Sequence, residues 1–79
     1  MKTLMKVERT VVVSAPGLGK KIKKARKADE RTLTDICAAV GMTTANWYRI
    51  EAEKQILPEV TLRKIESVLG VDLGVRFDG

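Results

Sequence analysis

The chain has 79 residues and a net charge of +5, which is the size of one small domain. Hydrophobic residues make up 44% and charged residues 32%, a balance typical of globular proteins and too apolar for a disordered chain. No apolar run approaches the roughly 18 residues of a membrane span, and the single cysteine excludes an internal disulfide. Without histidine, a zinc site of the Cys/His type is excluded as well. No signal-peptide pattern is present, so we expect a cytoplasmic protein.

The positive charge is concentrated in one short segment. Residues 20–28 hold six basic side chains and no acid, whereas residues 29–79 hold nine acids and six bases. Such a basic element indicates a polyanionic partner, either nucleic acid or an anionic membrane face. The alternative is a solvated helix face that binds nothing.

The first predicted elements are a strand and a basic helix. Residues 7–13 are β-branched and partly alternating, and a turn-forming segment follows at 14–17, which predicts a strand and then a turn. Leu18, Ile22 and Ala25 recur at helical spacing. Residues 18–28 are therefore predicted to form an amphipathic helix with lysines on its outer face.

Two short capped helices are predicted next. Thr32 and Asp35 form a pair that resembles a capping box and starts a helix, and Gly41 ends this helix in the left-handed conformation. Thr43 is the N-cap candidate of a helix that continues to about Glu51.

A loop and a fourth helix follow. Residues 52–57 are predicted to form the loop, and Pro58 fits the first turn of the helix, where its missing N–H costs nothing. Gly70 closes this helix. Its apolar face is made by Leu62, Ile65, Val68 and Leu69.

The C-terminal segment has the pattern of a strand. Every second residue from Val71 to Phe77 is apolar, which predicts a strand over residues 71–77. Because a lone strand exposes unpaired backbone groups, we expect the strands at 7–13 and 71–77 to pair, within one chain or across a symmetry axis. Phe77 is expected to be buried in this pairing.

The segment from Leu33 to Ile50 has the spacing of a helix–turn–helix motif. Two helices that cross at about 100–120° need a small residue where they approach, which Cys37 supplies, and a turn with positive φ, which Gly41 supplies. We interpret Cys37 as a small core residue and not as a nucleophile. The alternative for the segment is a generic helical hairpin. Five apolar residues form the small core of the motif: Ile36, Val40, Met42, Trp47 and Ile50.

These residues resemble the phage Cro and cI repressor-like helix–turn–helix regulators, often called the XRE family. The resemblance covers residues 18–71 and implies a mainly α, compact domain of four to five helices, to which the short terminal strands are added. It also implies a homodimeric transcription regulator that binds double-stranded DNA, with the whole chain, residues 1–79, forming one domain. The matching stretches are Leu18-x-x-x-Ile22-x-x-Ala25-Arg26, Ile36-Cys37-x-x-Val40-Gly41-Met42-Thr43, Tyr48-Arg49-Ile50-Glu51 and Leu62-x-x-Ile65-x-x-Val68-Leu69-Gly70-Val71.

The resemblance also implies which residues read the DNA bases. In this family the second helix of the motif lies in the major groove, with its N-terminal residues against base edges. Arg49 is expected to pair with guanine O6 and N7, and the methyl group of Ala45 is expected to contact a thymine methyl. The alternatives are a phosphate contact for Arg49 and surface packing for Tyr48. The matching positions are Thr43, Thr44, Ala45, Tyr48 and Arg49.

Phosphate contacts are expected mainly from the basic helix. The family commonly has a phosphate-binding glutamine where this chain has Leu33, and the loop after the second helix offers only Lys54. Arg26 and Glu51 match a pair of residues that form a structural ion pair in the family. The lysines expected to contact phosphate are Lys20, Lys23, Lys24, Lys27 and Lys54.

Other functions fit the sequence less well. The segment Gly17-Leu18-Gly19-Lys20 lacks the spacing of a phosphate-binding loop, and no histidine is present to act as a general base. We therefore expect no enzyme, no cofactor and no metal site. The main alternative function is an antitoxin or adaptor that uses the same scaffold to bind a protein partner. Binding to an anionic membrane is the third possibility.

Overall fold

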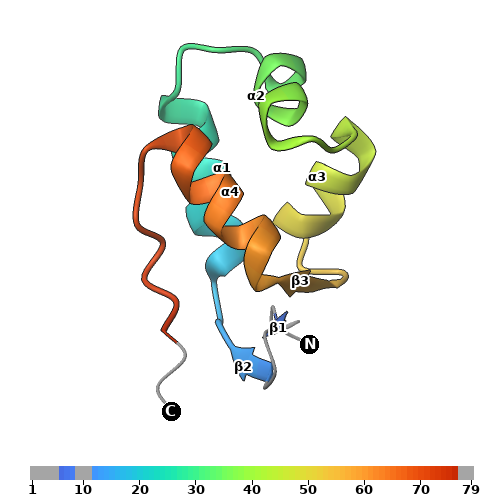
Figure 1. Ribbon diagram of the computed structural model, residues 1–79, viewed down its shortest axis with the longest axis vertical. Helices are drawn as coiled ribbons and strands as arrows, with labels where there is room; N and C mark the ends of the chain where they lie inside the picture. The colour runs from blue at the N-terminus through green and yellow to red at the C-terminus, as the bar shows by residue number, and fades with distance from the viewer. Residues whose placement is uncertain (1–5, 9–11, 77–79) are drawn as a thin grey trace.

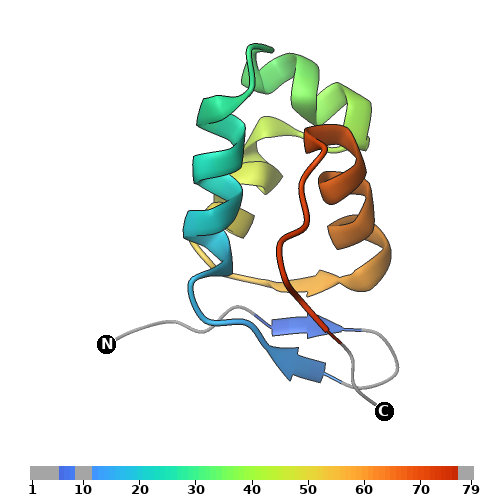
Figure 2. The same ribbon diagram turned by 90° about the vertical axis from the view of Figure 1, so that its left-hand side faces the viewer.

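Figure 1 shows the computed structural model, which describes residues 6–8 and 12–76. The predicted mainly helical architecture is confirmed: four helices surround a common core, and a small sheet lies at one end of the body (Figures 1 and 2). Within the described ranges, no helix is both long and apolar enough to cross a membrane. In chain order the elements are β1 (Lys6–Glu8), β2 (Val12–Ser14), α1 (Leu18–Ala28), α2 (Leu33–Val40), α3 (Thr44–Glu51), β3 (Ile56–Pro58) and α4 (Glu59–Leu69).

The helix ends follow from local chemistry that the sequence already contains. The Oγ1 atom of Thr32 accepts a hydrogen bond from the backbone N–H of Asp35 at 3.1 Å and starts α2, and Thr43 does the same for α3 through the N–H of Asn46. Gly41 ends α2 with φ +91°. The predicted capping residues are confirmed, except that Pro58 occupies the N-cap position of α4, one residue before its first turn.

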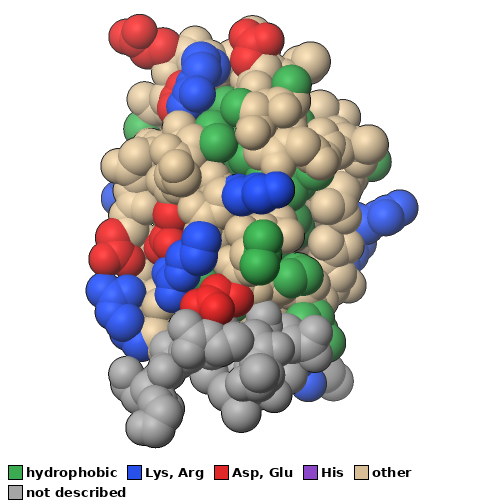
Figure 3. Space-filling view, in the orientation of Figure 1, with side chains coloured by type: hydrophobic (Ala, Val, Ile, Leu, Met, Phe, Trp, Pro, Cys, Tyr) green, Lys and Arg blue, Asp and Glu red, His purple; other side chains and the backbone are tan. Residues whose placement is uncertain are grey.

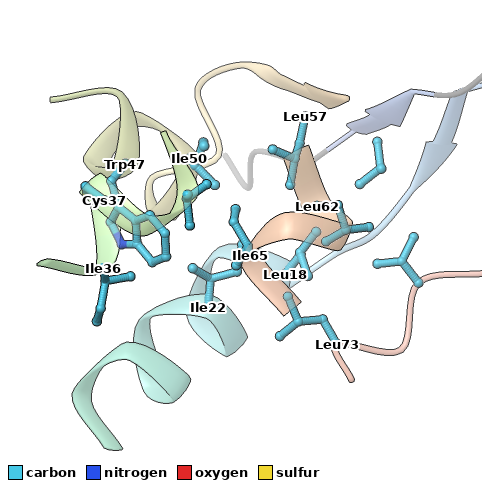
Figure 4. Close-up of a cluster of buried hydrophobic side chains, with 13 residues drawn as sticks. Leu18, Ile22, Ile36, Cys37, Trp47, Ile50, Leu57, Leu62, Ile65 and Leu73 are labelled. Atoms are coloured by element: carbon cyan, nitrogen blue, oxygen red, sulfur yellow. The ribbon is translucent and has the colours of Figure 1, made fainter. Parts of the chain in front are cut away.

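The core joins all four helices to the sheet. Figure 4 shows side chains from α1, α2, α3, β3 and α4 converging on one cluster, together with Leu73 from the C-terminal segment. The Trp47 side chain is fully buried, which confirms its interpretation as a core residue. Met42 is only partly buried at the edge of the cluster. The completely buried side chains are Val7, Ile22, Ile36, Trp47, Ile50, Leu57, Leu62 and Ile65.

The sheet differs from the prediction. The segment 7–13 does not form one strand but contributes to two, β1 and β2, which pair antiparallel with Val7 opposite Val13. The predicted loop 52–57 is wrong at its end, because residues 56–58 form β3, which pairs in parallel with β1. The strand order is β2-β1-β3. The β-branched segment therefore forms strands that pair with each other and with β3, and not with the C-terminal segment.

The predicted strand at 71–77 is also wrong over the described residues 71–76, which form no strand. Gly74 adopts φ +79°, which interrupts the extended backbone. The segment instead binds α4: the Glu66 carboxylate accepts the backbone N–H of Leu73 at 2.7 Å, and the Arg63 guanidinium donates to the carbonyl of Val75 at 3.1 Å. Leu73 and Val75 are buried. The alternating pattern therefore indicated that these two side chains are buried, but not which element covers them. The prediction for Phe77 lies outside the described residues.

Candidate nucleic-acid interface

One face of α3 is exposed to solvent. Helical periodicity turns Trp47 and Ile50 into the core, and their burial fixes which side of α3 points outward. Tyr48 is 55% exposed although it is large and apolar over most of its surface. Among the described residues, no carboxylate pairs with the Arg49 side chain. All the residues predicted to read bases lie together on this exposed face or at its start: Thr43, Thr44, Ala45, Tyr48 and Arg49.

The neighbouring Asn46 is not part of this face. Its Oδ1 atom accepts a hydrogen bond from Gln55 Nε2 at 3.0 Å, and its Nδ2 atom lies 3.8 Å from Met42 Sδ. The Asn46 side chain is half-buried, and both ends of its amide have hydrogen-bond partners. It therefore orders the loop after α3 instead of facing solvent. Thr43 is exposed, but its hydroxyl oxygen already accepts the capping hydrogen bond of α3.

A largely buried carboxylate fixes α3 against α1. The Glu51 side chain accepts hydrogen bonds from Arg26 Nε at 2.6 Å and from Trp47 Nε1 at 2.6 Å. A second Arg26 nitrogen reaches the other Glu51 oxygen at 3.1 Å, so the ion pair implied by the family resemblance is present and bidentate. The hydrogen bonds to Glu51 raise the pKa of Arg26. This arrangement sets the rotation of α3 and therefore the direction of its exposed face.

The two helices also touch at a glycine. A Cβ atom on Gly19 would lie 2.2 Å from the carbonyl oxygen of Glu51, so only glycine allows this approach. The backbone N–H of Gly19 donates to the Glu53 carboxylate at 3.2 Å, which places an acid at the positive end of α1. Gly19 and Glu53 were missed as positioning residues in the sequence. The available signal was a glycine seven positions before Arg26 and hence on the same helix face.

The lysines of α1 divide into two groups. Gly19 and Arg26 lie on the flank of α1 that faces α3. Lys23 is four residues after Gly19 and three before Arg26, so it lies on that same flank. Lys20 and Lys27 are one turn on either side of Lys23 and are exposed. Lys54 is exposed just after α3, and its backbone N–H donates to the carbonyl of Arg49. These four lysines are thus grouped beside the exposed face of α3.

Lys24 belongs to the other group. Together with Lys21 it lies on the opposite flank of α1, where both side chains line a groove against residues 71–74. Figure 1 shows the C-terminal segment and α3 on opposite sides of the molecule. The structure therefore does not bring Lys24 together with the other predicted phosphate contacts.

The face that carries α4 has a different character. Figure 3 shows acidic and basic side chains mixed on this face, with hydrophobic side chains near the junction of β3 and α4. Arg63 bridges Glu59 and Glu66 at 3.5 and 2.7 Å, so its positive charge is offset by two carboxylates. Ile56 and Val60 are 47% and 70% exposed at the junction.

Comparison with known proteins adds no homologue, since no family model, curated protein or solved structure matches the chain.

Proposed function

We propose that the chain is a helix–turn–helix regulator of the Cro/cI-like kind that binds double-stranded DNA sequence-specifically. The observation that carries the proposal is the exposed face of α3, whose side chains are suited to base edges and whose rotation is fixed by Glu51. The second motif helix would be α3, separated from α2 by residues 41–43. In this proposal α3 enters the major groove and α1 supplies positive charge beside it.

Base reading is assigned above all to Arg49. A guanidinium can donate two parallel hydrogen bonds to guanine O6 and N7, which is worth about 1–3 kcal/mol of discrimination against another base. Arg49→Ala should relax the requirement for guanine at one position of each half-site. Arg49→Lys is the matched control, because it keeps the charge but loses the bidentate geometry. If Arg49→Ala loses affinity equally for all sequences and Arg49→Lys retains it, Arg49 is a phosphate contact and the assignment is wrong.

Phosphate binding is assigned to the lysines beside α3. Each neutralised phosphate contributes a slope of roughly −0.9 to log K against log salt concentration. The double variant Lys20→Gln/Lys23→Gln should therefore flatten the slope by up to about 2 without changing the preferred sequence. Lys21→Gln/Lys24→Gln removes the same charge from the other flank and should change the slope less. Equal slopes for the two double variants would remove α1 from the specific interface.

Assembly as a homodimer is part of the same proposal. The longest dimension of the described chain is 34 Å, close to the roughly 34 Å between half-sites, so one subunit places α3 on one half-site only. The exposed apolar side chains of Ile56 and Val60 offer a surface for the subunit contact. Sedimentation of the wild type and of Val60→Glu, with and without DNA, tests this contact. Identical sedimentation of both proteins under both conditions contradicts it.

The same apolar surface favours one alternative function, an antitoxin or adaptor that binds a protein partner. Ile56, Pro58 and Val60 are all exposed around the junction of β3 and α4. An adaptor would show no preference among DNA sequences at physiological salt. Selection of bound duplexes from a random library separates the two functions.

A further inference from the structure

A groove outside the proposed DNA surface runs between α1 and the C-terminal segment. Ala25 and Ala28 of α1 form one wall, and residues 71–74 form the other. The groove has a volume of about 410 Å³, which is within the range of sites that bind small molecules. Its floor is apolar because Leu73 is buried beneath it and Val71 remains partly exposed.

The rim of this groove is cationic. Lys21 and Lys24 line it, and the Lys21 Nζ atom lies 3.8 Å from the point where a Cβ on Gly74 would stand. Among the described residues, no carboxylate pairs with either ammonium group. The one carboxylate on the rim, Asp72, is bound by the Arg76 guanidinium at 3.0 Å and by the backbone N–H of Gly74 at 2.8 Å. The two lysines are therefore available to an anionic ligand.

The walls of the groove are held by the fold itself. Glu66 and Arg63 of α4 bind the backbone of Leu73 and Val75, so the C-terminal segment is fixed opposite α1. A bound molecule would therefore enter a formed site and would not have to order the segment first.

We propose that this groove binds a small amphiphilic carboxylate, with the carboxylate between Lys21 and Lys24 and an aliphatic chain over Ala25, Ala28 and Leu73. Two unpaired ammonium groups at one end and an apolar floor match a molecule with one negative head and a short apolar tail. Burial of roughly five methylene groups of an eight-carbon chain corresponds to a dissociation constant on the order of 1 mM. This proposal does not depend on DNA binding.

The test is a titration of the full chain with sodium octanoate, followed by ¹H–¹⁵N NMR spectra. Saturable shifts are expected at residues 25, 28 and 71–74, while the α3 amides stay unchanged. Octylammonium has the same tail and the opposite charge, so it should bind at these residues severalfold more weakly than octanoate. Absence of saturation with octanoate, or equal binding of octylammonium, overturns the proposal.

Two pairs of variants locate the site. Lys21→Gln/Lys24→Gln should weaken octanoate binding about 2- to 30-fold, since each of two exposed ion pairs contributes about 0.2–1 kcal/mol. Lys20→Gln/Lys27→Gln removes equal charge from the outer face and should leave the affinity unchanged. Ala28→Phe should fill the groove and abolish binding while the far-UV circular dichroism spectrum stays native. Equal weakening by the two lysine pairs would mean diffuse charge attraction and would contradict the assigned site.

Discussion

Replacing Gly19 by alanine tests how α3 is held against the basic helix. The new Cβ would lie 2.2 Å from the Glu51 carbonyl oxygen, 2.8 Å from Glu53 Cγ and 2.9 Å from the Glu51 carbonyl carbon. The Glu53 side chain can rotate away, but the other two atoms belong to the backbone of α3. To restore ordinary contact, α1 and the end of α3 must separate by about 1 Å.

The expected cost follows from this forced separation. Overpacking a formed core costs about 1–3 kcal/mol. Alanine gains up to about 1 kcal/mol over glycine in a helix, but Gly19 is near the start of α1, where the gain is smaller. The separation also stretches the hydrogen bonds that Glu51 and Glu53 accept from α1. We expect a net loss of about 1–3 kcal/mol, or a fall in Tm of about 5–20 °C for a domain of this size.

The assay is thermal and urea unfolding followed by circular dichroism and by the fluorescence of Trp47. Lys20→Ala is the control, because this neighbour is exposed and alanine suits a helix. We expect the control to keep the stability of the wild type and Gly19→Ala to lose it. A Gly19→Ala protein with unchanged or higher Tm would refute the close contact and the reasoning built on it.

Three further predictions concern individual contacts. Glu51→Gln should cost about 1.5–3 kcal/mol, measured by urea unfolding, because Arg26 loses a charged partner; an unchanged midpoint would contradict this. Burial raises the pKa of the Cys37 thiol, so iodoacetamide should react only as the protein unfolds, and rapid alkylation of native protein would show that the thiol is accessible. The Arg31 guanidinium lowers the pKa of Asp29 from 3.8 to about 2, so this carboxylate stabilises the fold above pH 4 and loses that contribution as the pH falls toward 2. An NMR titration should find the Asp29 pKa raised part of the way toward its ordinary value in Arg31→Ala, because the backbone N–H of residue 31 still donates to the carboxylate; an unmoved pKa would contradict the assignment.

The helices could be predicted from the sequence because their signals are local. Thr32 and Thr43 cap through hydrogen bonds to residues three positions on, and Gly41 supplies a positive φ, so none of these signals depends on distant parts of the chain. The buried and exposed sides of α3 followed from the spacing of Trp47 and Ile50 in the same way.

The sheet could not be predicted because its pairing is not local. β3 has only three residues and ends in Pro58, so its own sequence resembles a loop. It is a strand because β1 pairs beside it. Alternation in the segment 71–76 correctly marked Leu73 and Val75 as buried, although Val71 is exposed, but period-two burial does not reveal whether a strand or a helix covers a face. The role of Gly19 also depends on a neighbour 32 positions away along the chain, Glu51.

The central claim is that the exposed face of α3 reads DNA sequence. The most direct measurement is selection of bound duplexes from a random library by the wild-type chain at physiological salt, in parallel with Arg49→Ala. We predict one enriched motif with two inverted half-sites, bound about 10³-fold or more tightly than shuffled DNA, and loss of a single guanine preference per half-site in the variant. Equal recovery of all sequences by the wild type, or the same enriched motif from both proteins, would contradict the claim.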